Sequence, residues 1–505
     1  MNKTSKIATL ILMLIGCCGN AFASDYRTAT PDIPKNWDPR YNTLGYYTRF
    51  SYQVFCSLLT IDENLNVSNA LANRWSVSDG GMKYIFEIRS DAGFQNGQSI
   101  LAEDVVLSLK RMISDSTLSK ELKVIKSIHV AKDKTEYPSR WNVDRKRVVI
   151  IELFRPYVQL LYIISSPAMA IFPAKQLMEN PNVFFKKPIS CGPFNIELIN
   201  KKTVILKKNK YYYNASQVKI ERIYFYKYNL NEAVSEFNKG SLDDIILYAA
   251  DKNEIKREYN VLNGRTYITR MLQFNTKKGV FKSLNMRKAF IYAFDKNNYV
   301  KLVNSKNLIP ATGFIPKGMI GYSESEYYLY SPEKSRKLLQ KEKVDHNKKI
   351  IIISSRPQEA EALSVIAKDI EKILGIAIEV KKVTSAEFYQ RWISFNDDIM
   401  LGGADSIYLD PYFQLRYAIP SYNERCITEF KNKNVEELLE RTQTIVNKSE
   451  RAKLYNKIDN LIMDDALILP LYYGSISTGI YSPDVYGIKL PPNGVQHVRY
   501  EIVSK

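Results

Sequence analysis

The sequence predicts a large α/β protein built from two or three domains. Its 505 residues exceed what one hydrophobic core usually holds. Runs with strand periodicity alternate along the chain with runs of helical periodicity. Around residue 350 an apolar run, a helical pattern and a second alternating run follow one another, which is the order of a βαβ unit. Hydrophobic residues make up 45% and charged residues 25%, as in an ordinary globular protein.

The first 23 residues have the pattern of an export signal. Two lysines precede an apolar run, 7–15, which is too short to span a bilayer. Ala21-Phe22-Ala23 is a cleavage pattern that would release a chain starting at Ser24, and we favour this scheme. In the alternative, 14–17 resembles a lipobox, which would make Cys17 a lipidated N-terminus. Both schemes place the mature protein outside the cytoplasm.

The stretch 71–112 predicts a hairpin followed by an amphipathic helix. Residues 83–89 alternate between the two sides of a strand, and 75–77 supply its partner. Ser78-Asp79-Gly80-Gly81 forms the turn between them, because glycine tolerates positive φ and aspartate bonds its own backbone. From Glu103 onwards apolar residues recur at helical spacing, with acidic residues in the first turn, where the helix dipole favours anions.

Later segments continue the alternation of strands and helices. Strands are predicted at 204–206, 220–228, 350–353 and 376–380, and an apolar stretch occupies 148–153. Helices are predicted at 231–239, 332–339, 363–374 and 454–462. Gly375 follows the 363–374 helix as its C-cap. The 350–380 unit should form a parallel sheet with a right-handed crossover.

Cysteine content restricts the redox chemistry. Cys56, Cys191 and Cys426 remain once the signal is removed. Three cysteines cannot all pair, so at most one disulfide forms. Their spacing fits no metal site. We expect three buried thiols.

Composition and motifs argue against nucleic-acid binding and catalysis. The net charge of +19 could indicate a polyanionic partner, but the basic residues are scattered and no groove-binding motif accompanies them. There are only three histidines, and the 474–479 run lacks the spacing of a nucleophile elbow. Gly313 and Gly318 stand at P-loop spacing without the Lys-Ser/Thr that must follow. We therefore predict no catalytic residue, no metal ligand and no cofactor.

The order and spacing of residues within 71–112 resemble the signature block of the family 5 extracellular solute-binding proteins, the oligopeptide- and dipeptide-binding receptors of bacterial ABC importers. Further segments resemble family motifs. Trp37-Asp38-Pro39 is similar to the family's "LDP", 191–194 to "GTGPY", 285–296 to the "VRQAL-x-YAIDR" helix, 311–316 to the "A-x-G-x-IP" loop and 469–472 to the "PL-Y" strand. The resemblance covers essentially residues 30–500.

This resemblance implies an α/β, type II periplasmic-binding-protein fold. Two lobes would enclose a ligand cleft, and the first lobe would carry an additional subdomain. The implied organisation is a signal peptide at 1–23, lobe 1 at 24–50, 173–271 and 478–505, the additional subdomain at 51–172, and lobe 2 at 272–477.

The resemblance also implies where a ligand lies. The expected binding residues are Asn42, Thr43, Leu44 and Gly45 in lobe 1, and Leu401, Gly402, Gly403, Ala404 and Asp405 in lobe 2. In peptide-binding members a segment resembling "G-W-x-A-D-Y-x-D-P" pairs its first Asp with the peptide α-amino group, while its backbone bonds the peptide as an added strand.

This chain departs from that segment in two ways. Gly402 or Gly403 stands where the Trp is expected, and the spacing from Asp405 to Asp410-Pro411 is two residues longer than usual. Asp405 is our candidate partner for a ligand amine. Asp410 is expected to cap the following helix, with Pro411 at its first position.

We therefore expect a monomeric periplasmic protein that captures peptides by hinge closure and delivers them to the permease and ATPase subunits of an ABC importer. One alternative is the same fold binding an opine, a sugar, haem or a metal chelate. A second alternative is a ligand-sensing domain that docks to a membrane sensor.

Overall fold

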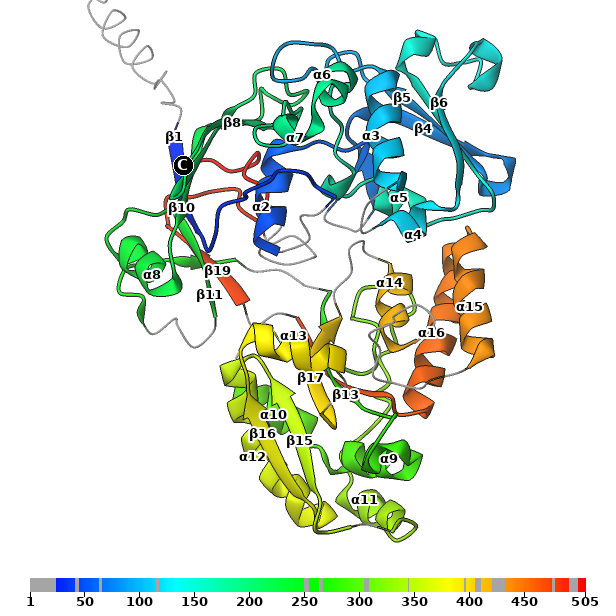
Figure 1. Ribbon diagram of the computed structural model, residues 1–505, viewed down its shortest axis with the longest axis vertical. Helices are drawn as coiled ribbons and strands as arrows, with labels where there is room; N and C mark the ends of the chain where they lie inside the picture. The colour runs from blue at the N-terminus through cyan, green and yellow to red at the C-terminus, as the bar shows by residue number, and fades with distance from the viewer. Residues whose placement is uncertain are drawn as a thin grey trace, which may run out of the picture.

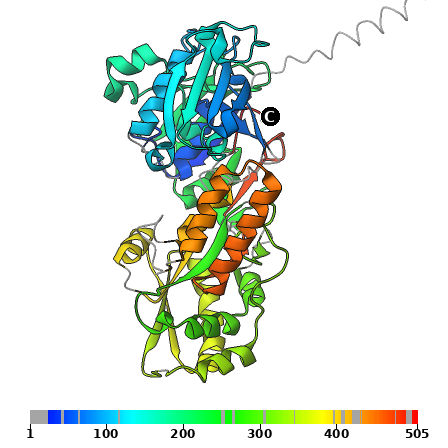
Figure 2. The ribbon, with the colours of Figure 1, turned by 90° about the vertical axis from the view of Figure 1, so that its right-hand side faces the viewer.

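Among the residues that the structure describes, three larger sheets and a two-stranded ribbon organise the protein, which is seen here in a computed structural model. The seven-stranded and four-stranded sheets belong to the upper half of Figure 1, and the six-stranded sheet belongs to the lower half. Figure 2 shows the same two halves from the side. The structure describes residues 24–40, 45–62, 66–114, 118–248, 254–262, 267–303, 308–343, 345–394, 397–404, 410–419, 430, 432–474, 477–489 and 498–505.

The seven-stranded sheet forms the centre of the upper half. Its spatial order is β12 (Asn260–Val261), β19 (Ser477–Tyr481), β11 (Asp244–Tyr248), β1 (Ser24–Thr30), β10 (Ile220–Lys227), β9 (Thr203–Lys208) and β8 (Phe194–Ile199). Strand β1 pairs in parallel with both β10 and β11. Helix α2 (Gly45–Val54) packs in the same hydrophobic cluster as Phe225 of β10, whereas α8 (Leu230–Asn238) packs with the next residue, Tyr226. Because successive side chains of a strand point to opposite faces, the two helices cover opposite faces of this sheet.

The four-stranded sheet confirms the predicted hairpin. Its order is β4 (Ala72–Ser78), β5 (Lys83–Ile88), β7 (Val148–Leu153) and β6 (Ile125–Val130). Asp79, Gly80 and Gly81 adopt positive φ in the turn between β4 and β5. The predicted helix is α3 (Ala102–Ser114), and it buries Val105, Leu109 and Met112. The two-stranded ribbon joins β2 (Leu59–Ile61) to β3 (Val67–Asn69).

The six-stranded sheet contains the predicted βαβ unit. Its order is β14 (Ile309–Pro310), β18 (Ile468–Tyr473), β13 (Thr269–Phe274), β17 (Ile399–Ala404), β15 (Lys349–Ser354) and β16 (Ala377–Lys382). Strands β15 and β16 are parallel and connected by α12 (Pro357–Leu374). Gly375 ends α12 at φ +67°, as predicted, because that backbone conformation disfavours other residues.

The other helices formed by the described residues are divided between the two halves. They are α4 (Ser119–Leu122), α5 (Leu160–Ile163), α6 (Ala174–Glu179), α7 (Pro181–Phe184), α9 (Leu284–Ala293), α10 (Lys296–Val303), α11 (Pro332–Leu339), α13 (Ser385–Ser394), α14 (Pro411–Leu415), α15 (Lys433–Thr444) and α16 (Lys448–Asp464). Short 3-10 turns lie at Asp79–Gly81, Lys134–Glu136, Arg145–Arg147, Pro167–Met169, Val280–Lys282 and Arg416–Ala418. The helices predicted at 231–239, 332–339 and 454–462 are confirmed, whereas 285–296 divides between α9 and α10. No helix of the described residues is both long and apolar enough to cross a membrane.

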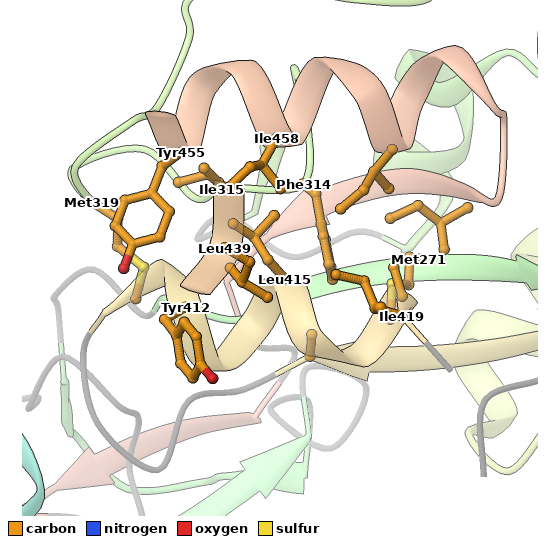
Figure 3. Close-up of a cluster of buried hydrophobic side chains, with 14 of the residues drawn as sticks. Met271, Phe314, Ile315, Met319, Tyr412, Leu415, Ile419, Leu439, Tyr455 and Ile458 are labelled. Carbon is orange, nitrogen blue, oxygen red and sulfur yellow. The ribbon is translucent and has the colours of Figure 1, made fainter. Parts of the chain in front are cut away.

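Helices α14, α15 and α16 pack together beside the six-stranded sheet. Leu415, Leu439 and Ile458 come from the three helices and are all fully or almost fully buried. Figure 3 shows them turned toward one another, with Phe314 beside them. This cluster fixes α14, the first described element after the predicted ligand segment at 401–405.

Two chain crossings join the halves, as the predicted fold requires. The chain passes from β12 to β13 and returns from β18 to β19. Next to the return crossing, the amide of Gly474 donates to the carbonyl of Ile268 at 3.0 Å. The residue boundaries of the lobes and of the additional subdomain stay a prediction.

The prediction of three buried thiols is wrong, because Cys56 and Cys191 form a disulfide. Residues 57–190 between them include strands β2 to β7, and we call this part of the chain the four-stranded unit. The bridge joins the two chain segments at its base. The same segments are in backbone contact. A Cβ at Gly192 would lie 2.4 Å from the carbonyl of Val54. Cys426 lies outside the described residues.

Replacing both bridge cysteines by serine should lower the free energy of unfolding by about 2–4 kcal/mol, because the unfolded chain loses a long closed loop. Urea denaturation of the Cys56→Ser/Cys191→Ser protein would measure this, with Cys426→Ser as the control that keeps the bridge. Reaction of all mature cysteines with a thiol reagent, in protein unfolded without reductant, would contradict the bridge.

Candidate ligand-binding site

The lower sheet has a topological switch point between β15 and β17. These neighbouring strands are parallel, and β16 lies on the far side of β15. Helix α12 packs on the face that holds Ile352, whereas α13 packs through Phe388 and Trp392 on the face of Ile353 and Met400. In open α/β sheets, ligands bind outside the carboxyl ends of the strands at such a point. The carboxyl ends of β15 and β17 are therefore the candidate site in this half.

Strand β17 has an unpaired backbone edge at this point. Its pairing with β15 ends at Met400, which lies opposite Ile353. Beyond Met400 the strand continues to Ala404, paired on its other side with β13. Within the described part of the chain no strand covers the β15 side of 401–404. Four of the predicted site residues, Leu401, Gly402, Gly403 and Ala404, thus lie along an edge that could accept an added strand.

The second glycine of β17 makes room for a buried arginine. Gly403 lies opposite Arg270 of β13, and a Cβ at Gly403 would stand 2.6 Å from Arg270 Nη1. At Gly402 the nearest atom to such a Cβ is Gln273 Oε1, at 3.4 Å. A tryptophan at position 403 would therefore collide with Arg270, which gives a physical reason for the departure from the family segment.

Arg270 is held by an ion pair with Glu359 of α12. Its Nε and Nη2 donate to the two oxygens of Glu359 at 3.0 and 2.9 Å. The hydroxyl of Tyr472 also donates to Glu359, at 2.5 Å. Burial alone would raise the pKa of Glu359, but the guanidinium groups of Arg270 and Arg356 outweigh it and hold the pKa below its usual range. The pair is therefore charged at neutral pH.

The upper sheet repeats this topology around β1, which lies between β10 and β11. Helix α2 is fixed at the β1/β11 boundary by Arg49. Its Nη2 donates to Thr28 Oγ1 and to Asp244 Oδ2, both at 2.7 Å. Of the four predicted lobe 1 site residues, Gly45 is the first residue of α2. Asn42, Thr43 and Leu44 lie outside the described residues.

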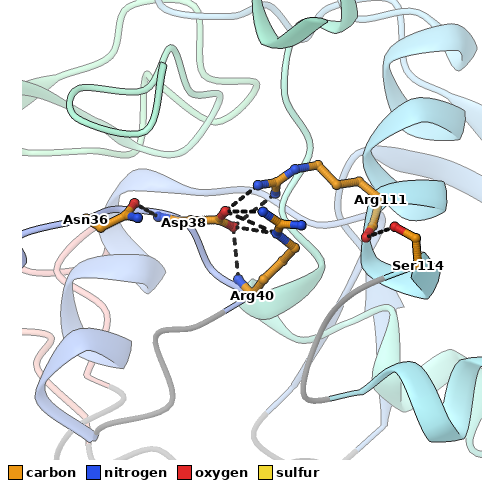
Figure 4. Close-up of polar contacts among 5 residues, drawn as sticks. All are labelled: Asn36, Asp38, Arg40, Arg111 and Ser114. Carbon is orange, nitrogen blue, oxygen red and sulfur yellow. Dashed lines mark hydrogen bonds and ion pairs between the residues drawn. The ribbon is translucent and has the colours of Figure 1, made fainter. Parts of the chain in front are cut away.

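Asp38 fixes the chain just before these residues through two ion pairs. Figure 4 shows its carboxylate between two guanidinium groups. Arg40 Nη2 and Arg111 Nη1 each donate to it at 2.9 Å, and only 3% of Asp38 is exposed. Burial alone would raise the pKa of Asp38, but the hydrogen bonds from Arg111 and Arg40 outweigh burial and lower it. Because Arg111 belongs to α3, this contact joins the start of the site segment to the four-stranded unit.

On the lower side the predicted amine partner, Asp405, lies outside the described residues. The predicted role of Asp410 is confirmed. Its Oδ1 accepts from the amide of Tyr412 at 3.0 Å, and Pro411 is the first residue of α14. Asp410 also accepts from the Tyr455 hydroxyl and from Gln159 Nε2 of the upper half.

The sequence did not reveal the buried charged pairs beside β17 and β11. Arg270, Glu359, Arg49 and Asp244 stand singly in their segments, without a motif that marks them. The paired residues are far apart in the chain, so no local pattern could have identified them. Within the described ranges no group of histidine, cysteine and acidic residues is arranged to hold a metal ion.

Residues 66–424 match the sequence profile of the bacterial extracellular solute-binding proteins, family 5. The chain belongs to this family. It is 24% identical over 447 residues to the dipeptide-binding protein DppE of Bacillus subtilis, an alignment that covers 84% of this chain and 82% of that protein. The predicted family is thus confirmed.

Solved structures show the predicted type II fold. DppA of Helicobacter pylori, in complex with the peptide STSA, superposes with a TM-score of 0.77 at 20% identity and covers 95% of this chain and 98% of its own. NikZ of Campylobacter jejuni, in complex with Ni(L-His), gives 0.79 at 23% identity and covers 95% of this chain and 99% of its own. As a family 5 solute-binding protein, the chain therefore has the two-lobed type II fold.

We expect Gly403→Ala to lower the free energy of unfolding by about 1–3 kcal/mol, because the new methyl group would push Arg270 away from Glu359. Gly402→Ala is the matched control and should cost less than about 1 kcal/mol. Urea denaturation of the two variants measures the difference. Equal losses at both positions would mean that Arg270 does not restrict position 403.

Asp38→Asn should destabilise the protein in a pH-dependent way. A carboxylate with a lowered pKa stabilises the folded state above its unfolded pKa of about 3.9, and the contribution is lost as the pH falls through the lower folded pKa. We expect the variant to lose about 3 kcal/mol near neutral pH, since two guanidinium groups lose their partner. The difference from wild type should shrink below about pH 4.

Chemical denaturation across this pH range tests the prediction. The matched control is Asp91→Asn, because Asp91 also pairs with an arginine, Arg89, but its side chain is 59% exposed. The control should lose less than about 1 kcal/mol. A loss at Asp38 that is the same at every pH would contradict a role for its charge.

Proposed function

We propose that this protein captures peptides outside the cytoplasmic membrane, as a monomer, and delivers them unaltered to the permease of an ABC importer. The observation that carries the proposal is the unpaired edge of β17 at 401–404. That edge presents N–H and C=O groups at the spacing of an extended peptide backbone. An opine, a sugar or haem has no regular array of groups to match it.

Two of the relatives named above support the same ligand class. DppE is named for dipeptide binding, and the H. pylori protein holds a peptide. No observation favours an opine, a sugar, haem or a metal chelate over a peptide. Nor does any observation favour a sensor domain over a transport component.

Closure of the two halves would trap the ligand. The halves are joined by two chain crossings, and each presents the carboxyl ends of parallel strands at a switch point. Rotation about the crossings would bring Gly45, at the start of α2, toward β17. Asp405, which directly follows β17, is the proposed partner of the peptide ammonium group. We further propose that export removes residues 1–23, or alternatively leaves a lipidated Cys17.

Asp405→Asn keeps the size of the side chain and removes its charge. A buried ammonium without a partner costs about 3–5 kcal/mol, so the variant should bind free-amine tetrapeptides at least about tenfold more weakly, roughly 1.4 kcal/mol. N-acetylated tetrapeptides should be affected much less. Calorimetric titration of both proteins with both ligand types is the measurement.

Asp91→Asn serves as the control, because it removes a carboxylate from the exposed surface of the four-stranded unit. Equal weakening for both ligand types would show that Asp405 is not the ammonium partner. No saturable binding of any peptide to the wild-type protein would reject the proposed ligand class itself.

A further inference from the structure

Helix α14 of the lower half is bonded at both ends to the four-stranded unit of the upper half. At its N-terminus, Gln159 Nε2 donates to Asp410 Oδ1 at 3.4 Å. At its C-terminus, Arg416 Nη1 and Glu121 Oε1 form an ion pair at 2.6 Å. In Figure 1, α14 accordingly lies directly below α4 and α5. The halves therefore meet at this short helix as well as at the chain crossings.

These cross-half contacts are shielded from water. Gln159 is fully buried, Asp410 is 1% exposed and the Glu121 side chain is 7% exposed. Gln159 Nε2 also donates to the hydroxyl of Tyr455 at 3.2 Å. Hydrogen bonds to charged groups are stronger than those between neutral groups, and shielded ion pairs contribute more than exposed ones. The contact is thus placed to stabilise one particular arrangement of the two halves.

The same helix is bonded to the end of the candidate ligand edge. Gln414 lies one turn after Asp410 and is fully buried. Its Nε2 donates to the main-chain carbonyl of Tyr267 at 2.8 Å and to that of Ala404 at 3.4 Å. Ala404 is the last residue of β17. Helix α14 therefore connects the contact between the halves to the edge at 401–404.

The lower half keeps its own hydrogen bonds when this contact opens. Without Gln159, the Asp410 carboxylate still accepts from the amide of Tyr412 and from the hydroxyl of Tyr455. Gln159 itself acts only through Nε2, because its Oε1 makes no hydrogen bond within the described part of the chain. Opening therefore leaves no carboxylate at α14 without a donor, so the contact can form and break without unfolding either half.

We propose that this contact is a latch that holds the halves in the ligand-trapping arrangement, with Gln159 and Glu121 as positioning residues for binding at β17. The inference rests on the proposed function, because the trapped ligand is the peptide at 401–404. The apparent affinity of a protein that must close depends on the population of its closed form. Residues that touch no ligand therefore change the affinity when they stabilise that form.

Gln159→Met keeps the length of the side chain and removes the donor to Asp410. We expect tetrapeptide affinity to fall about tenfold, through faster dissociation with a nearly unchanged association rate. Free-amine and N-acetylated tetrapeptides should lose the same factor, since the latch touches neither. Stopped-flow kinetics with a fluorescent tetrapeptide and calorimetric titration measure these changes in the full mature chain.

Gln176→Met is the matched control. Gln176 of α6 also has an Oε1 without a donor among the described residues, and its Nε2 donates to Gln98 at 3.0 Å within the upper half. It therefore loses the same kind of bond without affecting the contact between the halves. Its tetrapeptide affinity and dissociation rate should equal those of wild type.

Charge exchange tests the other end of the helix. Glu121→Arg places like charges together at Arg416 and should weaken tetrapeptide binding at least about tenfold. The double variant Glu121→Arg/Arg416→Glu restores opposite charges and should recover most of the lost affinity, because the two positions are coupled. Such recovery would distinguish the latch from a general loss of folding.

The amide of Val158 reports the latch without any peptide. It donates to the main-chain carbonyl of Gln443 across the halves, at 2.9 Å. In Glu121→Arg its protection against hydrogen exchange should fall about tenfold, while the amides within β5 exchange as in wild type. The double variant should restore the protection of Val158.

Three results would overturn the latch. They are unchanged dissociation rates in both Gln159→Met and Glu121→Arg, a loss that differs between free-amine and N-acetylated tetrapeptides, and wild-type protection of the Val158 amide in Glu121→Arg. Absence of saturable tetrapeptide binding to the wild-type protein would instead reject the proposed function. The exchange of Val158 would then still decide whether this contact holds the halves together.

Discussion

The ion pair between Arg270 and Glu359 determines the shape of the β17 end. Arg270 lies across the strand at Gly403, and the carboxylate of Glu359 holds it there from the first turn of α12. The pair thereby links β13, β17 and α12 at the switch point where a ligand would bind. Removing either partner would leave a buried charge, so the two residues can change only together. The open backbone edge at 401–404 lies directly beside this ion pair.

The upper half contains a second buried arginine–carboxylate pair. Arg49 joins α2 to Asp244 at the start of β11, and Tyr500 of the C-terminal segment donates to the same carboxylate at 2.8 Å. Both halves therefore place an arginine–carboxylate pair next to a segment that we propose contacts the ligand. Such a pair gives direction as well as stability, because the planar guanidinium group bonds only along its edges. Asp38 extends this arrangement to the four-stranded unit through Arg111.

The four-stranded unit also contacts the lower half, at a place away from the β17 edge. Its base is closed by Cys56–Cys191. Its far end forms ion pairs from Glu121 to Arg416, the C-cap of α14, and from Arg155 to Glu440 of α15. Gln159 reaches the same carboxylate, Asp410, that caps α14. Movement of one half relative to the other must therefore rearrange this interface as well as the β17 end.

The sequence by itself determined the elements whose causes are local. The 75–89 hairpin, α3 and the βαβ unit follow from periodicity, a glycine turn and the Gly375 cap, all within a few residues of the structure that they produce. The family, and with it the two-lobed fold, followed from the spacing of short segments. Only the tertiary structure decided which cysteines pair, why position 403 is glycine and which buried charges stand together. Each of these depends on residues that are distant in the chain and meet only when the sheets assemble, so no local pattern in the sequence records them.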